Sequence, residues 1–437
     1  MHIIHRQTCR VCGSPHLSPA IDLGEQFLQG SFVKEGHVVP PLRKIPTMLV
    51  RCDVEKNEKG CGLIQTGHSV PPDILYANYW YRSGTNATMR DHLGGIVQSA
   101  LEISGAKSGR VLDIGCNDGT LLSNYSDSFV KFGVDPSDIA QGIKPPVTVI
   151  NTVFPSRQLN TLVGDKKFDI ITSIAMYYDL ESPTGFARAI ADLLAPEGIW
   201  IVEMSYLPLM LKQNSFDTIC HEHLEYYSLA VLEYIARDAG LRVFKASLND
   251  VNGGSIRLYL TKADNIRYDN KEVTDFLRCL RLYEFDLKLD TAEPYQAFQR
   301  RIEDVRGKLE AFLTAARRRG EHIHVYGAST KGNVLLQWCR IGSSMVDCAA
   351  DRNPDKHGAH TLGTNIPIVS EEESRAARPD YYLVLPWHFK AEFLERERPA
   401  IMAGTKMIFP LPEVTVVDKT NIDTEIEKAR KADFLAL

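Results

Sequence analysis

Residues 111–119 read VLDIGCNDG, an apolar run that ends beside an acid and passes directly into a turn with two glycines. A short apolar run bounded by a glycine turn is typical of a buried strand. Gly115 and Gly119 allow the backbone to approach a ligand closely because they carry no side chain. The two glycines are four positions apart, so the turn lacks the G-x-G-x-x-G pattern of a dinucleotide site. The sequence therefore predicts a cofactor loop that is not built for a nicotinamide dinucleotide.

A second acid follows the glycine turn. The segment FGVDPS closes the next apolar run with Asp135, about twenty residues on, where an acid can accept both ribose hydroxyls of an adenosyl ligand. Together these features resemble the S-adenosylmethionine loop of class I methyltransferases, and the resemblance places Asp113 beside the ligand amine. Ligands of such sheets bind outside the carboxyl ends of the strands. The cofactor-binding residues predicted on this basis are Asp113, Gly115, Cys116, Asn117, Gly119, Asp135 and Tyr177.

Short apolar runs alternate with amphipathic segments from residue 110 onward. The runs read RVLDIGC, VKFGVD, VTVIN, FDIITSI, GIWIVEM, LRVFKAS and SIRLYLT. This alternation predicts an α/β fold with a Rossmann-like, doubly wound sheet, and the number of runs matches the seven-stranded sheet of class I methyltransferases. The last two runs lack a crossover helix between them. We therefore expect them to pair as an antiparallel edge through a turn at residues 249–254.

The overall composition excludes several classes of partner. The chain has 437 residues, enough for about two to three domains. A net charge of -5 and a pI near 6.2 leave no basic field for nucleic acid. The N-terminus, MHIIHRQTCRVCG, has no apolar signal core, and no run approaches the roughly 18 apolar residues of a membrane span. We therefore expect a cytoplasmic protein without nucleic-acid or membrane partners. The sequence does not specify an oligomeric state, and a monomer is the working expectation.

Four of the nine cysteines fall in the first 61 residues. Cys9 and Cys12 form a CxxC motif, whereas eight residues separate the second pair, Cys52 and Cys61, and this charged insertion would loop out. Two cysteine pairs can close a tetrahedral zinc site that keeps no open coordination position. The sequence therefore predicts a structural Zn²⁺ in an N-terminal module at residues 1–75.

A second dense segment follows the fifth apolar run, at the edge where the transferable methyl group should point. It reads ICHEHLEYYS, and it places His221, Glu222 and His223 close to Tyr226 and Tyr227. The two histidines are two positions apart and do not share a helical face, so this is not the HExxH zinc pattern. An imidazole titrates near neutrality, and a neighbouring carboxylate can tune its basicity. The segment therefore predicts an acid–base site beside the methyl donor.

Over nearly its whole length the chain resembles the sugar 3-C-methyltransferases of deoxysugar biosynthesis. The resemblance rests on the motifs CxxC, CGLIQ, NYWYRSGTN, LDIGCNDGTLL, FDTICHEHLEYYS, NGGSIRLY, HVYGASTKGNVLLQW and LVLPWHF. It implies a methyltransferase domain at residues 76–262 and a C-terminal domain at residues 263–437 that helps to bind a nucleotide-linked 4-keto-6-deoxysugar. The sequence does not indicate whether the nucleotide is TDP or GDP, nor which configuration the hexose has.

The same resemblance assigns roles to the dense segment. It implies that His223 removes the proton at carbon 3, next to the carboxylate of Glu222. An imidazole can take a proton alpha to a ketone once the enediolate is stabilised, and methyl transfer then requires mainly alignment. The catalytic residues predicted in this way are His223, Glu222, His221 and either Tyr79 or Tyr81.

One position departs from the family. A tyrosine often stands directly before HEH, whereas this chain has Cys220. A thiol is a poorer hydrogen-bond donor than a phenol. We therefore expect another donor to hold the sugar, with Tyr178 and His388 as candidates.

Residues 323–351 repeat the plan of strand, glycine turn, helix and strand, which predicts a second Rossmann-like α/β domain. The turn from Gly327 to Gly332 can present backbone amides and Lys331 to a pyrophosphate at a helix start. Only Asp351 corresponds to a ribose-binding acid, so we expect phosphate binding rather than a second cofactor. The amphipathic stretch at residues 295–319 is expected to be a packing helix. The predicted substrate-binding residues are Tyr178, Asn252, Ser329, Lys331, Asn333, Trp387 and His388.

Two other functions remain open from the sequence. An O-methyltransferase acting on the same class of sugar needs the same cofactor loop, and a histidine base serves a hydroxyl equally well. A non-catalytic zinc protein that binds S-adenosylmethionine as a sensor would bind the ligand without turnover. Exchange of the carbon 3 proton with solvent deuterium is expected only for C-methylation.

Overall fold

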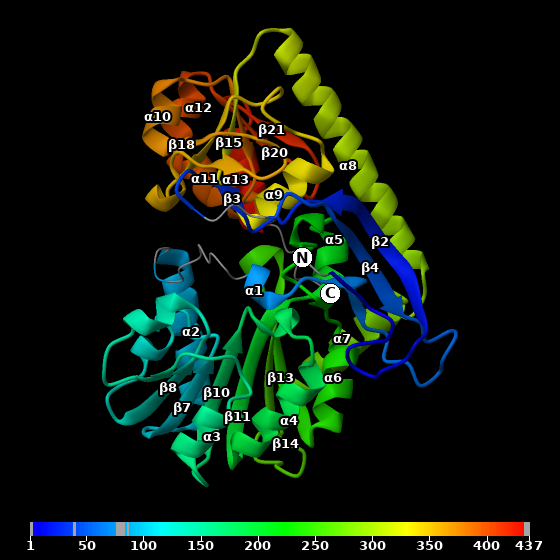
Figure 1. The fold of residues 1–437 in the computed structure, drawn as a ribbon, viewed down its shortest axis with the longest axis vertical. Coiled ribbons are helices and arrows are strands. Elements are labelled where there is room, and N and C mark those ends of the chain that lie inside the picture. Colours follow the sequence, from blue (N-terminus) through cyan, green and yellow to red (C-terminus); the bar gives the residue numbers. More distant parts are fainter. Residues whose placement is uncertain (1–2, 38–40, 76–83, 85–86, 432–437) are drawn as a thin grey trace.

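The computed structural model describes residues 3–37, 41–75, 84 and 87–431. It has three parts, which Figure 1 shows with the seven-stranded domain at the bottom, the C-terminal domain at the top and the N-terminal module, in blue, beside them. Among the described residues, no helix has both the length and the hydrophobicity required to span a membrane.

All seven predicted runs are strands of one sheet, with the order β13-β14-β11-β10-β7-β8-β9. The strands β7 to β11 are parallel to one another, and β14 runs antiparallel between β11 and β13. The predicted class I methyltransferase sheet and its antiparallel edge are therefore confirmed. The strands are β7 (Gly109–Ile114), β8 (Phe129–Val134), β9 (Thr148–Ile150), β10 (Phe168–Ile174), β11 (Leu194–Ser205), β13 (Leu241–Asn249) and β14 (Ser255–Lys262).

Helices cover both faces of this sheet because its strands are apolar on both faces. On β7, Val111 belongs to the core under α2 (Ala87–Ser104), whereas Leu112 belongs to the core on the opposite face. That opposite face is covered by α4 (Pro183–Leu193) and α6 (Leu229–Asp238), and α7 (Lys271–Asp286) packs on α6 and β13. Two shorter helices, α3 (Arg157–Val163) and α5 (Leu207–Lys212), complete this part.

The N-terminal module is a four-stranded antiparallel sheet with the order β12-β5-β4-β2. Its first three strands along the chain are β2 (Leu17–Gln26), β4 (Ile45–Cys52) and β5 (Ile64–Thr66). The fourth strand, β12 (Glu225–Tyr226), comes from the seven-stranded domain and begins two residues after His223. A small ladder of β1 (Ile4–His5) and β6 (His68–Ser69) lies beside this sheet. The segment that sequence analysis singled out is thus built into the N-terminal sheet.

The C-terminal domain has a six-stranded sheet with the order β18-β16-β15-β19-β20-β21, parallel except for β21. This confirms the predicted Rossmann-like domain. Its strands are β15 (Ile323–Tyr326), β16 (Cys348–Asp351), β18 (Ile368–Ser370), β19 (Tyr381–Val384), β20 (Lys406–Phe409) and β21 (Thr415–Val417). Its helices are α9 (Thr330–Trp338), α10 (Glu371–Ala376), α11 (Lys390–Arg396), α12 (Arg398–Ala403) and α13 (Ile422–Lys431).

The N-terminal module connects the other two parts. Its strand β3 (Phe32–Val33) pairs with β17 (His360–Thr361) of the C-terminal domain. The long helix α8 (Glu293–Arg318) packs along β2 (Figure 1), and its buried residues recur at helical spacing from Tyr295 to Leu313, as expected for a packing helix. One continuous core contains side chains of all three parts. Packed apolar side chains therefore hold the three parts together.

Candidate active site

The glycine turn after β7 has the backbone that the sequence predicts. Gly115 and Gly119 have φ angles of 76° and 80°, in the left-handed region that favours glycine. A Cβ atom on Gly115 would lie 3.0 Å from the Cγ atom of Met176, so a side chain there would also be crowded. Asn117, between the two glycines, has a φ angle of 48°. The turn can therefore present its backbone to a ligand at close range.

Two acids lie at the carboxyl ends of β7 and β8. Asp135 accepts hydrogen bonds from the backbone N–H of Asn117 at 2.9 Å and from that of Ser137 at 2.8 Å. Asp113 is buried and accepts a 2.6 Å hydrogen bond from the hydroxyl of Thr172. Burial raises the pKa of Asp113 to about 7, the Thr172 bond opposes this rise, and the charge of Asp135 adds to it. Two neighbouring carboxyl groups beside the turn favour a ligand that carries a positive charge.

Two predicted cofactor residues lie within the protein core. Tyr177 is fully buried, and its hydroxyl donates to the carbonyl of Pro183 at 2.9 Å. Its ring packs against Trp200 with the ring centroids 5.5 Å apart. Cys116 is buried too, and its sulfur occupies the space where a Cβ atom on Gly133 would be. The structure therefore gives these two side chains packing roles and does not bring them to the surface of the loop.

The four cysteines of the N-terminal module converge. The sulfur of Cys9 lies 3.4 Å from that of Cys61, and the sulfur of Cys12 lies 3.5 Å from that of Cys52. All four ligand atoms lie within 4.8 Å of one another. A tetrahedral zinc ion with Zn–S bonds of about 2.3 Å would hold its sulfurs about 3.8 Å apart, whereas a disulfide requires about 2.05 Å. The arrangement fits a closed structural zinc site, and the hairpin from β4 to β5 brings Cys61 back to it despite the longer insertion.

His223 lies between two parts of the molecule with one ring nitrogen already engaged. Its Nδ1 atom is 2.8 Å from the carbonyl oxygen of Thr218, so Nδ1–H donates and Nε2 is the nitrogen that can accept a proton. The ring also contacts Tyr178 with the centroids 4.2 Å apart. Burial, and then the charge of Lys331, lowers the pKa of His223 to about 3. The imidazole is therefore neutral near pH 7.

The other two members of the HEH triplet face the N-terminal module. His221 is buried, and its Nε2 atom lies 3.1 Å from the hydroxyl of Thr47 on β4. Burial lowers the pKa of His221 to about 4. Glu222 lies against Gly30, where a Cβ atom would come within 2.0 Å of its Oε1 atom. Burial raises the pKa of Glu222. Of the three, His223 alone contacts Thr218 and Tyr178.

The C-terminal domain contributes a cation to the surroundings of His223. Helix α9 packs on the 3-10 turn η5 (Phe216–Thr218), which carries the carbonyl that holds His223. Lys331, in the first turn of α9, interacts electrostatically with both Asp217 and His223. Burial lowers the pKa of this lysine, and Asp217 partly offsets the effect. His388 also interacts with Lys331, and burial followed by that charge lowers its pKa to about 3.

Three family models match consecutive stretches of the chain. They describe a zinc binding domain at residues 9–76, a methyltransferase domain at residues 86–246 and a C-methyltransferase C-terminal domain at residues 250–412. Together the three models indicate an S-adenosylmethionine-dependent C-methyltransferase. This confirms the family predicted from the motifs, and it confirms S-adenosylmethionine and structural zinc as the cofactors.

Named relatives of this C-methyltransferase include C-methyltransferase NovU of Streptomyces niveus, which is 28% identical over 416 residues, or 94% of this chain and 96% of NovU. The solved structure of the CcbJ methyltransferase of Streptomyces caelestis covers 43% of this chain and 95% of its own at 13% identity, with a TM-score of 0.34. The structure of magnesium protoporphyrin IX methyltransferase of Synechocystis PCC 6803 covers 41% of this chain and 88% of its own at 14% identity, with a TM-score of 0.31.

Several residues predicted to bind substrate in this C-methyltransferase have structural roles. Ser329 caps α9, since its hydroxyl accepts a 3.1 Å hydrogen bond from the backbone N–H of Gly332. Asn333 donates to the carbonyl of Gln29 at 2.7 Å and so joins α9 to the N-terminal module. Trp387 donates from its indole to Asp217 at 2.9 Å. Asn333 and Trp387 therefore join the C-terminal domain to the other two parts. Lys331 is the predicted substrate residue whose charge acts on His223.

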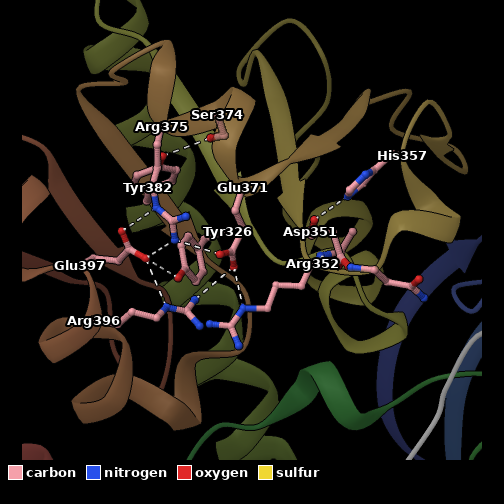
Figure 2. A network of polar contacts seen from close by, with 12 residues as sticks. Tyr326, Asp351, Arg352, His357, Glu371, Ser374, Arg375, Tyr382, Arg396 and Glu397 are labelled. Carbon is pink, nitrogen blue, oxygen red and sulfur yellow. Dashed lines mark hydrogen bonds and ion pairs between the residues drawn. The ribbon is translucent and has the colours of Figure 1, made fainter. Parts of the chain in front are cut away.

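Asp351 and a nearby cluster of arginines and glutamates each form contacts within the C-terminal domain. The carboxylate of Asp351 accepts a hydrogen bond from the backbone N–H of Ala328 at 2.8 Å. Figure 2 shows Arg375 and Arg396 directed toward Glu371 and Glu397, next to Tyr326. Each arginine is already paired with a carboxylate. This cluster therefore links α10 to α11, and Asp351 supports the turn before α9.

The structure adds two residues that sequence analysis did not assign and leaves three undescribed. Asp217 and Thr218 lie in the motif FDTICHEH, but only their packing shows that one pairs with Trp387 and the other orients His223. Tyr226, expected in the acid–base set, is buried and donates to the same Thr218 carbonyl at 3.2 Å. Tyr227 is buried, and its hydroxyl donates a hydrogen bond to the carbonyl of Tyr177 at 3.4 Å. Outside the described residues lie Tyr79, Tyr81 and the side chain of Asn252.

Proposed function

We propose that this C-methyltransferase methylates carbon 3 of a nucleotide-linked 4-keto-6-deoxyhexose, with His223 as the general base. The observation that carries the proposal is the 2.8 Å contact between Nδ1 of His223 and the carbonyl of Thr218. It fixes the tautomer, so Nε2 is the proton acceptor and is turned away from the backbone. The family models and the similarity to NovU support transfer to carbon.

The chain's own residues account for deprotonation. Nε2 of His223 takes the proton from carbon 3, and the electron pair of that C–H bond moves toward the neighbouring ketone to form an enediolate. Lys331 lies close enough to His223 to lower its pKa, and the same positive charge would stabilise the developing oxyanion in a site that excludes water. S-adenosylmethionine, when bound at the glycine turn, would supply an electrophilic methyl group on a sulfonium. The bond from carbon 3 to the methyl group would form as the methyl–sulfur bond breaks, and the sulfur would leave as a neutral thioether.

We further propose that the start of α9 helps to bind the pyrophosphate of the nucleotide. Lys331 stands in the first turn of α9, where the N-terminus of a helix favours phosphate. Asn333 bonds to Gln29 and Trp387 bonds to Asp217, so the C-terminal domain is fixed to the other two parts near this lysine. A pyrophosphate of either TDP or GDP would meet the same lysine and the same backbone.

Mass spectrometry tests the proposal directly. The protein would be incubated with S-adenosylmethionine and a panel of TDP- and GDP-linked 4-keto-6-deoxyhexoses. The expected result is one added methylene on ring carbon 3 of one member. Addition on oxygen instead would replace the proposal with O-methyl transfer, and no addition despite bound donor would contradict both.

Deuterium exchange isolates the proposed base. In D₂O without the methyl donor, wild-type protein should exchange the carbon 3 proton of its substrate, whereas His223→Asn should not. His221→Asn compares the other imidazole of the triplet, and it should retain the exchange because His221 contacts Thr47 of the N-terminal module. Equal exchange by wild type and His223→Asn would contradict the assignment.

A further inference from the structure

Arg10 lies inside the zinc knuckle, between Cys9 and Cys12, yet its side chain makes its contacts outside the cysteine cluster and is 0% exposed. Its Nη1 atom donates to the carbonyl of Thr66 at 2.9 Å and to the side chain of Gln65 at 3.1 Å. Both of these residues belong to β5. The arginine therefore ties the knuckle to the strand that pairs with β12.

Glu225, on β12, is the buried charge that faces this arginine. Its side chain is 0% exposed, and its Oε1 atom lies 3.7 Å from Nε of Arg10. Neither of its carboxylate oxygens forms a hydrogen bond of ordinary geometry with a described residue. Burial raises the pKa of Glu225, Arg10 opposes the rise, and Glu181 and Asp179 add to it. Arg10 is thus the close positive charge that favours the carboxylate form of Glu225.

Glu225 stands two positions after His223 in the chain. Between them, the backbone N–H of Leu224 donates to the carbonyl of Tyr178 at 2.7 Å, and its carbonyl accepts from Thr66 at 2.9 Å. Tyr178 contacts the His223 ring. A shift of β12 against β5 would therefore move both the base and the ring packed on it.

We propose that Arg10 is a positioning residue that couples the four-cysteine centre to the loop carrying His223. Its guanidinium holds β5 through Gln65 and Thr66, and it holds β12 through Glu225. The four-cysteine centre fixes the backbone from which Arg10 extends, so the geometry of the base depends on a site in another part of the molecule. The inference rests on the proposed role of His223.

Arg10→Met tests the coupling, with Arg6→Met as the matched control. Arg6 forms an ion pair with Glu181 at 3.2 Å, as Arg10 does at 3.3 Å, and its charge also acts on Glu225. Among the described residues, however, the side chain of Arg6 forms no hydrogen bond with β5 or β12. Arg10→Met should keep its zinc, measured by elemental analysis. Hydrogen–deuterium exchange of the backbone amides at residues 219–227 should rise, and kcat should fall about 100-fold, as expected for a displaced catalytic group. Arg6→Met should stay within about three-fold of wild type, because a partly exposed ion pair contributes little.

A double variant separates positioning from general support of the fold. Removing Arg10 alone leaves a buried carboxylate without its counter-charge, whereas removing both charges does not. If Arg10 acts by tying β12 to β5, Arg10→Met with Glu225→Gln should stay within about three-fold of Arg10→Met alone, because both variants lack the tie. Recovery of wild-type turnover by the double variant would show that only the unpaired buried charge mattered, and this result, or zinc loss from Arg10→Met, would overturn the proposal.

Two further measurements keep the test decisive. If Arg10→Met does not fold, Arg10→Lys keeps the charge and loses the planar donors, and it should show increased exchange at residues 219–227. Unchanged exchange in both arginine variants would overturn the inference. The exchange readout requires no substrate. Wild-type protein that methylates no sugar would therefore contradict the proposed function, while the exchange data would still decide whether Arg10 holds the loop.

Discussion

Gly30 lies where a single added methyl group would disturb catalysis more than folding. An ideal Cβ atom on Gly30 would be 2.0 Å from Oε1 of Glu222 and 3.4 Å from the hydroxyl of Thr330. Ordinary contact begins at 3.4 Å, so the carboxylate must move by about 1.4 Å in Gly30→Ala, while Thr330 can stay in place. The atom that moves is the end of a flexible side chain next to His223.

The stability change should be small because two effects oppose each other. Replacing a glycine by alanine at a compatible backbone conformation stabilises a protein by about 0.4–1 kcal/mol through the unfolded state. Forcing Glu222 off its preferred rotamer costs about 0.5–1.5 kcal/mol. The net change is therefore within about 1 kcal/mol. The role that the family resemblance implies for Glu222 beside His223 predicts that a displacement of this size lowers kcat about 10- to 100-fold.

The assay compares thermal melting with turnover of the sugar substrate. Gly95→Ala is the control, since a Cβ atom on Gly95 in α2 meets nothing within 4 Å. We expect Gly30→Ala to melt within about 3 °C of wild type and to lose turnover, and Gly95→Ala to retain both. Turnover of Gly30→Ala within two-fold of wild type would refute the role of Glu222. A large loss of melting temperature would refute the reasoning on packing.

Three further predictions concern the base, its pH dependence and the metal. His223→Asn should lose methyl transfer by about two or more orders of magnitude while binding S-adenosylmethionine as wild type does; calorimetry and turnover check this, and activity within a few-fold would assign the base elsewhere. Burial, then Lys331, lowers the pKa of His223 to about 3, so the neutral base persists to acidic pH and kcat/KM should show no acid limb near 6.5. Lys331→Met removes the neighbouring cation and should move the acid limb to higher pH, and an unchanged profile would contradict that coupling. Cys12→Ser should release zinc and weaken sugar binding. The affinity for S-adenosylmethionine should be retained, because the glycine turn lies in another domain. Retained sugar affinity in zinc-free, folded protein would contradict the role of the module.

Much of the fold could be predicted because its signals are local. Each of the seven apolar runs is long enough to identify a buried strand, and the glycines at 115 and 119 mark a turn whose backbone other residues rarely adopt. The four cysteines identify their own site because thiolate ligands are few and their chemistry is specific. These features depend on neighbours a few residues away or on side-chain type alone.

The arrangement around His223 could not be predicted in the same way. Gly30, Glu222 and Thr330 meet although they lie far apart in the chain, and Arg10 meets Glu225 in the same manner. Sequence patterns do not encode which packed layers will touch, since such contacts depend on how helices and sheets of three parts bury their apolar faces together.

The sequence by itself determined which segments form the seven strands, where the cofactor turn lies, which residues are the zinc ligands, and which family the chain resembles. The tertiary structure decided which chemical groups are available. It placed Tyr177 in the core, used Ser329 as a helix cap, and brought Lys331 to His223. The physical reason is that a side chain's chemistry is fixed by its type, whereas its hydrogen-bond partners, burial and neighbouring charges are fixed only when the chain has packed.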